Sequence, residues 1–115
     1  LHLGNIAIRR DWGWAPEYVD AMWRMLQQEK PEDYVIATGE SHSLEEFVDT
    51  AFSAAGLNWR DHVVLDPGLL RPTDLAAGRG NPAKARAKLA WQARHKMHEV
   101  VRLMVDAERQ PGTSL

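Results

Sequence analysis

The sequence predicts a small mixed α/β domain with about four helices and two to three short strands. The chain has 115 residues, which is enough for one hydrophobic core and too few for a two-domain enzyme. Its composition, 44% hydrophobic and 26% charged, is typical of a globular protein. Several segments repeat apolar residues at helical spacing, and short apolar runs between them indicate strands. We therefore expect one domain over residues 1–115.

The first half of the chain alternates extended and helical segments. Residues 4–9 indicate a short strand, and Pro16 suits the first position of a helix that runs to about residue 29, before Pro31. Residues 34–38 indicate a second strand, ended by Gly39. We expect the apolar stripe of the helix to pack in the core; it comprises Tyr18, Val19, Met22, Trp23, Met25 and Leu26.

The second half begins with the clearest local motif of the chain. Ser43 and Glu46 form a capping box that predicts a helix over about residues 44–55, stopped by Gly56. Residues 62–66 indicate a short buried strand, and a loop follows over residues 70–74. Asn81 and Pro82 predict the start of a helix that ends near residue 89. A last helix is expected over about residues 95–109, with a frayed tail over residues 110–115.

The predicted strands are too few for a complete sheet of ordinary size. Strands without partners normally pair with another part of a larger protein. The chain also opens at Leu1 rather than at a methionine. We therefore expect it to be a fragment of a longer protein.

Several classes of protein lack their sequence signature here. No apolar run approaches the roughly 18 residues of a membrane-spanning helix, so no membrane contact is expected. The absence of cysteine excludes a disulfide scaffold and a thiolate metal site, and the default location is cytoplasmic. The sequence contains no glycine-rich dinucleotide fingerprint, no P-loop and no hydrolase nucleophile elbow.

Two clusters of charged residues have ordinary explanations. His95, His98 and Glu99 stand at helical spacing, but no clear third ligand accompanies the two histidines, so we predict no metal site. The basic residues between positions 79 and 102 could lie against nucleic acid. The solvated face of an amphipathic helix explains them better, and we expect no nucleic-acid partner.

Two arginines stand where an anionic ligand could be held. Arg10 lies at the end of a predicted strand just ahead of the first helix, and a guanidinium matches phosphate oxygens. The simpler interpretation is a surface arginine paired with Asp11 or Glu17. Arg71 is followed three residues later by Asp74, which offers a guanidinium for a diphosphate and a carboxylate for ribose hydroxyls. Together, Arg10 and Arg71 give a testable pair for a sugar-nucleotide site.

Longer motifs support a resemblance to a known family. They are Arg10-Asp11-Trp12-Gly13, the run Asp-Tyr-Val-Ile-Ala-Thr-Gly-Glu over residues 33–40, and Arg71-Pro72. These motifs, with matches along nearly the whole chain, resemble the C-terminal half of GDP-mannose 4,6-dehydratases. That family belongs to the extended short-chain dehydrogenase/reductases.

The resemblance implies a fold and an activity. The chain would be the small substrate-binding domain, with the Rossmann domain that holds NADP absent from it. Full-length members are lyases of deoxysugar biosynthesis that convert GDP-D-mannose to GDP-4-dehydro-6-deoxy-D-mannose. Because their catalytic Thr/Ser, Glu, Tyr and Lys lie in the Rossmann part, we expect no catalytic residue and no bound cofactor in this chain. Its expected partners are GDP-mannose or a related nucleotide sugar and the Rossmann domain.

The resemblance also implies site residues. Arg10 and Arg71 would hold the GDP diphosphate, and Asp74 would hold the ribose. The chain departs from the family at Trp14, where histidine is usual, at Asp74, where glutamate is usual, and at Ala76, where aspartate is usual. Asp74 is one methylene shorter, so a ribose contact needs loop movement or a bridging water. The alternative function is a non-catalytic module of the same origin that binds a protein partner or forms a homo-oligomer.

Overall fold

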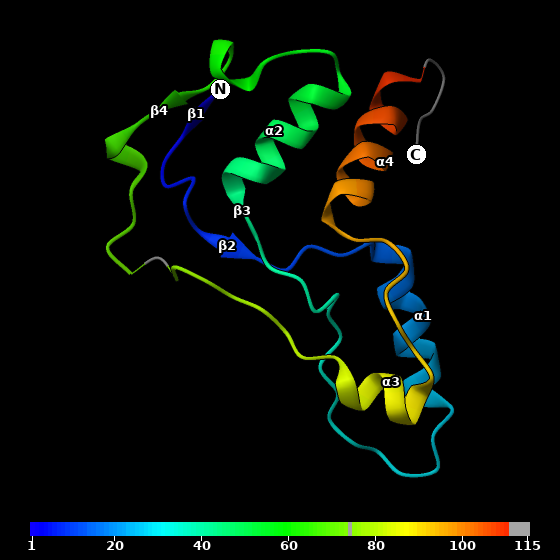
Figure 1. The fold of residues 1–115 in the computed structure, drawn as a ribbon. Coiled ribbons are helices and arrows are strands. Elements are labelled where there is room, and N and C mark those ends of the chain that lie inside the picture. Colours follow the sequence, from blue (N-terminus) through cyan, green and yellow to red (C-terminus); the bar gives the residue numbers. More distant parts are fainter. Residues whose placement is uncertain (74, 111–115) are drawn as a thin grey trace.

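The computed structural model describes residues 1–73 and 75–110. Its elements follow in the order β1 (His2–Leu3), β2 (Arg9–Arg10), α1 (Ala15–Leu26), β3 (His42–Ser43), α2 (Leu44–Ala54), β4 (Val64–Leu65), α3 (Ala83–Leu89) and α4 (Met97–Arg109). Two 3-10 turns, η1 (Trp59–Asp61) and η2 (Pro67–Leu69), flank β4. The predicted class of small mixed α/β domain with about four helices is confirmed (Figure 1).

Two small sheets hold distant segments of the chain together. β1 pairs in parallel with β4, and β2 pairs antiparallel with β3, which places Arg10 opposite His42. An isolated bridge between Arg9 and Ala77 adds a third segment beside β2. The region around β2 is therefore built from three parts of the sequence.

The helix α2 begins as its sequence predicts. The hydroxyl Oγ of Ser43 accepts a hydrogen bond from the backbone N–H of Glu46 at 3.1 Å, and the Glu46 carboxylate accepts one from the backbone N–H of Ser43 at 3.5 Å. Gly56 follows the helix with a φ of +75°, a conformation that glycine adopts without strain. The capping box and the glycine stop are both confirmed.

The predicted core stripe of α1 is largely wrong. Ala21 is the fully buried residue of this helix, and it packs with Ala85, Leu89, Trp91 and Ala93 from α3 and the segment that follows it. Tyr18 and Met25 pack partly against that cluster. The other four residues of the stripe, Val19, Met22, Trp23 and Leu26, have exposed fractions of 62%, 59%, 61% and 81%. The reason is that α3 and residues 91–93 cover only the Ala21 side of α1.

Two of the three predicted strands differ from the structure in position or pairing. Residues 34–38 do not form a strand, although Gly80 lies against Val35 and Ala37; the N–H of Thr38 bonds the side chain of Asp11 instead. In residues 4–9, only Arg9 is in a strand, and the side chain of Asn5 accepts from the N–H of Ala7 in a local turn. β4 lies within the third predicted strand, but its two residues are about half exposed rather than buried.

The helices α3 and α4 lie close to their predicted positions. The helix α3 begins one residue later than predicted, because Pro82 and not Asn81 is at the N-cap position. The side chain of Asn81 accepts from the N–H of Ala83, the first residue of α3, at 3.1 Å. In α4, Met97, Val100 and Val101 are almost fully buried. α4 lies beside α2 (Figure 1).

The molecule is flat. Its principal extents are 52, 41 and 20 Å, and its radius of gyration is 16.8 Å, against about 13 Å for a compact domain of this length. Asp74 and residues 111–115 of the predicted tail lie outside the described residues. Within the described part, no helix has both the length and the apolar character that a membrane crossing requires.

Candidate functional site

Arg10 lies at the end of β2, against residues 75–78. Its Nη1 donates to the carbonyl of Leu75 at 2.6 Å and to the carbonyl of Arg9 at 2.8 Å. The backbone of the two segments is also joined, because the N–H of Gly78 donates to the carbonyl of Arg9 at 2.9 Å. The guanidinium is thus fixed where the loop that carries Arg71 returns to β2.

Arg71 is exposed and lies in the same loop. Its side chain makes no hydrogen bond or ion pair to any other described residue. It stands four residues before Leu75, and an extended chain of that length spans at most about 14 Å. Asp74, the predicted ribose ligand, lies outside the described residues. The joint role of Arg10, Arg71 and Asp74 in holding one ligand therefore stays a prediction.

An open hollow of about 570 Å³ lies beside β2. Its size is within the range of about 300–1,000 Å³ that is common for small-ligand sites. Arg9 and Arg79 contribute positive charge to it, and Arg9 is held by a hydrogen bond to the carbonyl of Ser41 at 2.8 Å. The residues that line it are Arg9, Gly39, Glu40, Ser41, His42, Ala77, Gly78 and Arg79.

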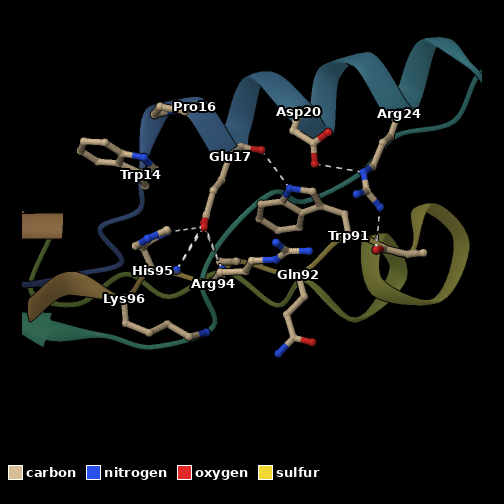
Figure 2. Close-up of a pocket in the computed structure, with 12 residues that line it drawn as sticks. Trp14, Pro16, Glu17, Asp20, Arg24, Trp91, Gln92, Arg94, His95 and Lys96 are labelled. Carbon is tan, nitrogen blue, oxygen red and sulfur yellow. Dashed lines mark hydrogen bonds and ion pairs between the residues drawn. The ribbon is translucent and has the colours of Figure 1, made fainter. Parts of the chain in front are cut away.

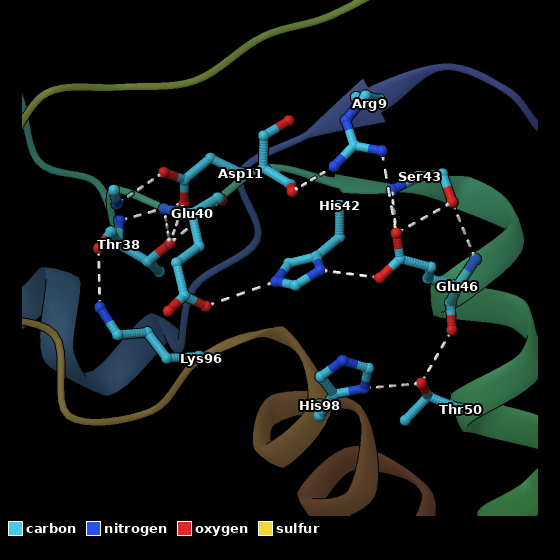
Figure 3. Close-up of polar contacts among 12 residues, drawn as sticks. Arg9, Asp11, Thr38, Glu40, His42, Ser43, Glu46, Thr50, Lys96 and His98 are labelled. Carbon is cyan, nitrogen blue, oxygen red and sulfur yellow. Dashed lines mark hydrogen bonds and ion pairs between the residues drawn. The ribbon is translucent and has the colours of Figure 1, made fainter.

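The simpler interpretation of Arg10, a surface pair with Asp11 or Glu17, is wrong. The Asp11 carboxylate accepts from the N–H and the hydroxyl of Thr38 at 3.0 and 2.7 Å and from the N–H of Gly39 at 2.9 Å (Figure 3). Glu17 accepts from backbone N–H groups of residues 94 and 95. Both carboxylates therefore hold distant segments of backbone in place.

A second hollow, of about 1000 Å³, lies between α1 and residues 90–96 (Figure 2). Trp14 lines it, with its ring centroid 6.2 Å from that of His95, and the imidazole Nδ1 of His95 lies 2.6 Å from the Glu17 carboxylate. Arg24 spans it to the carbonyl of Ala90 at 2.7 Å. Sequence reasoning missed this hollow, because its two walls lie far apart in the chain.

The histidines near α4 separate in the structure. His95 belongs to the Glu17 contact, whereas His98 faces α2, where its Nδ1 lies 2.9 Å from the hydroxyl of Thr50. His98 approaches His42 and Glu46 there rather than His95 or Glu99. A hydrogen bond from His42 is the main reason that the pKa of Glu46 is lowered, so this carboxyl is ionised at neutral pH.

Two of the three basic residues of α3, Lys84 and Lys88, lie beside Glu32. Lys88 donates to the Glu32 carboxylate at 2.8 Å, and Lys84 donates to the carbonyl of Asp33 at 2.8 Å. The hydrogen bond from Lys88 is the main cause of the lowered pKa of Glu32. These contacts support the interpretation of this segment as a solvated helix face.

The described residues show no glycine-rich turn between a strand and a helix. Each strand has two residues, and β3 passes into α2 through the capping Ser43 rather than through a glycine-rich turn. Binding of NADP through a helix N-terminus needs such a turn.

Residues 1–104 match the family model described as GDP-mannose 4,6 dehydratase. The chain is 50% identical over 108 residues to GDP-mannose 4,6 dehydratase 1 of Arabidopsis thaliana, covering 94% of this chain and 30% of that protein. It is 42% identical over 123 residues to the human GDP-mannose 4,6 dehydratase, covering 92% of this chain and 33% of that one.

The fold also resembles solved structures. A UDP-glucose 4-epimerase of Thermus thermophilus, in complex with NAD, superposes with a TM-score of 0.80 at 25% identity over 96% of this chain and 36% of that one. The chain thus spans about a third of the length of the proteins that it matches. On the family match over residues 1–104, the chain belongs to the GDP-mannose 4,6 dehydratase family.

Proposed function

We propose that the chain is the nucleotide-sugar-binding part of a cytoplasmic GDP-mannose 4,6-dehydratase. The observation that supports this most is the fixed position of Arg10 beside the loop of Arg71, in a chain of this family. In this proposal the full-length enzyme makes GDP-4-dehydro-6-deoxy-D-mannose and uses NADP. This chain alone is not catalytic, because the dinucleotide and the reacting groups belong to the rest of the enzyme.

The proposed roles follow from the charges and positions of the side chains. Arg10 is oriented by the carbonyls of Leu75 and Arg9, so its positive charge meets the diphosphate with little loss of side-chain freedom. Arg71 is exposed and swings onto the same diphosphate when the ligand binds. Asp74 accepts from the ribose hydroxyls. The chain binds and orients the nucleotide, while NADP supplies the hydride chemistry in the full-length enzyme.

The test is a chimera in which this chain replaces the matching third of the Arabidopsis thaliana enzyme. Binding of GDP-mannose is measured by isothermal titration calorimetry. Arg71→Ala and Arg10→Ala are each expected to weaken binding about 10- to 100-fold, since each removes hydrogen bonds to a charged group. Arg86→Ala is the matched control, because Arg86 is an exposed arginine on α3, and this variant should bind like the parent. Equal binding by Arg71→Ala and the parent would remove the role given to Arg71.

A second candidate function is a protein-interaction module, and the exposed apolar stripe of α1 favours it. Val19, Met22, Trp23 and Leu26 repeat at helical spacing and lie open to solvent. Under the enzyme proposal, the remaining part of the full-length protein covers this stripe. The relatives are about three times as long as this chain, and the molecule is flat. Under the alternative, a second copy of the chain covers the stripe.

Sedimentation equilibrium of the chain separates the two candidates. A monomer that binds the N-terminal part of a relative, and loses that binding in Trp23→Glu, supports the enzyme proposal. A dimer that becomes monomeric in Trp23→Glu supports the module. Leu103→Glu, an exposed apolar residue on α4, is the control and should change neither result.

A further inference from the structure

His42, Glu46 and His98 gather where β3, α2 and α4 meet (Figure 3). One ligand atom from each lies within 4.8 Å of the others. The Nδ1 of His42 is 2.9 Å from Oε2 of Glu46, and the two imidazole rings meet edge to face with centroids 5.2 Å apart. Two imidazole nitrogens and one carboxylate oxygen are a donor set that first-row divalent metals take.

The hydrogen bonds of Thr50 set the orientation of His98. Its hydroxyl donates to the carbonyl of Glu46 at 2.8 Å, and a hydroxyl has only one proton. Thr50 therefore accepts its second hydrogen bond, of 2.9 Å, from the protonated Nδ1 of His98. This network assigns the lone pair to Nε2 of His98, the form of imidazole that binds metals.

The other two ligands also have outer partners. The Nε2 of His42 lies 3.4 Å from the Glu40 carboxylate, which can accept its proton while Nδ1 faces the metal. The Oε1 of Glu46 is engaged by the N–H of Ser43, which leaves Oε2 to coordinate. Metal-binding histidines and carboxylates usually have such partners, which fix their orientation.

The surrounding charges are compatible with a cation. The carboxyls of Glu40 and Glu46 both lie beside His42, and Nη1 of Arg9 lies 3.8 Å from Oε1 of Glu46, the oxygen that also faces Ser43. Lys96 directs its Nζ to the carbonyl of Thr38 at 2.7 Å. Without a metal, the hydrogen bond between His42 and Glu46 satisfies the same atoms, so a metal has to replace only that contact.

We propose that His42, Glu46 and His98 bind one first-row divalent metal ion, such as Zn²⁺, with water completing its coordination. The site does not depend on the proposed nucleotide-sugar function. The ion would join the start of α2 to the start of α4, two helices that are in contact but far apart in the sequence. It would therefore stabilise their packing.

The test is calorimetric titration of the 115-residue chain with Zn²⁺ in a buffer that does not chelate metals. We expect one equivalent to bind and the thermal midpoint to rise with Zn²⁺. His98→Ala and Glu46→Gln should each weaken binding at least tenfold, and neither removes a core side chain, because His98 is exposed and glutamine keeps the shape of glutamate. Visible absorption of the Co²⁺-loaded chain should show bound metal in the parent and lose it in both variants.

His2→Ala is the matched control. His2 is exposed at the opposite sheet, and its removal should leave Zn²⁺ binding unchanged. Circular dichroism of each variant verifies that it is folded. Absence of binding to the parent chain, or equal affinity in the parent and in folded His98→Ala, would overturn the proposal.

Discussion

Two sides of the molecule differ in how completely they bury their own apolar side chains. The helical side, made of α1, α3 and residues 91–97, buries Trp91, whose indole N–H donates to the carbonyl of Glu17 at 2.9 Å. The loop side, made of β1 and residues 62–80, has no buried residue among those described, and Leu65, Leu69 and Leu70 are about half exposed. The helical side therefore stabilises itself, whereas the loop side leaves apolar surface to another molecule or domain.

This difference leads us to expect that the helical side determines stability and the loop side determines ligand binding. Arg71 and Leu75, whose carbonyl accepts from Arg10, belong to the loop side, where few apolar contacts hold the backbone. Segments of low local stability can rearrange around a ligand, and binding residues are often found on them. We therefore expect mutations on the helical side to change unfolding, and mutations on the loop side to change binding.

The largest test of this contrast is Trp91→Ala. Trp91 has an exposed fraction of 2%, so its removal should lower the free energy of unfolding by about 3–5 kcal/mol through a cavity and a lost hydrogen bond. Urea denaturation followed by circular dichroism measures the change. Trp23→Ala is the control, because Trp23 is 61% exposed, and it should change the value by less than about 0.5 kcal/mol. Similar losses in both variants would break the comparison.

A second test is Asp11→Ala, at the junction of the two sides. Its carboxylate accepts three hydrogen bonds from Thr38 and Gly39, which hold that segment next to β2. Removal should cost about 2 kcal/mol, because part-buried N–H groups lose a charged acceptor. Urea denaturation measures the loss, and Asp49→Ala, an exposed aspartate on α2, is the control. If the two variants were equally stable, the hydrogen bonds of Asp11 would not contribute to the free energy of unfolding.

Local sequence predicted the helices well and the strands poorly. The capping box at Ser43 involves residues within three positions of each other, so the sequence alone contains the interaction. The segment over residues 34–38 has strand-forming residues, but a strand also needs a hydrogen-bonded partner strand, and no described segment pairs with it in this way. For the same reason, the sequence could not show that only one side of α1 is covered.

The candidate site was partly predictable. Arg10 and Arg71 were identified from short motifs in a family context, and the structure brings the loop of Arg71 to β2. Two contacts were missed. Asp11 accepts from Thr38, 27 residues away, and Glu17 contacts His95, 78 residues away. Hydrogen bonds over such distances leave no periodic pattern in a sequence.

A third test uses pH at the β3–α2 junction. Because His42, and then Ser43 and Arg9, favour the charged form of Glu46, its pKa is lower in the folded chain than in the unfolded one. The resulting stability is present at neutral pH and is lost as the pH falls below the ordinary carboxyl value of about 4.3. Glu46→Gln should therefore be less stable at pH 7 by under about 1 kcal/mol, since the side chain is 42% exposed, and the difference should shrink toward about pH 3. Urea midpoints across this range measure it, and a constant difference would contradict the prediction.

The smallest expected effect is that of Leu70→Ala on the loop side. Leu70 is 55% exposed and follows η2, so the substitution removes methyl groups that solvent already reaches, and the free energy of unfolding should change by less than about 0.5 kcal/mol. A small change would sharpen the contrast with Trp91, because it would show that apolar residues on the loop side do not form a hidden core. A loss above about 1 kcal/mol in urea denaturation would place Leu70 in a packed cluster and remove the distinction between the two sides. The same variant in the chimera tests whether Leu70 contributes to ligand binding. Weaker binding of GDP-mannose with unchanged stability would assign Leu70 to ligand recognition.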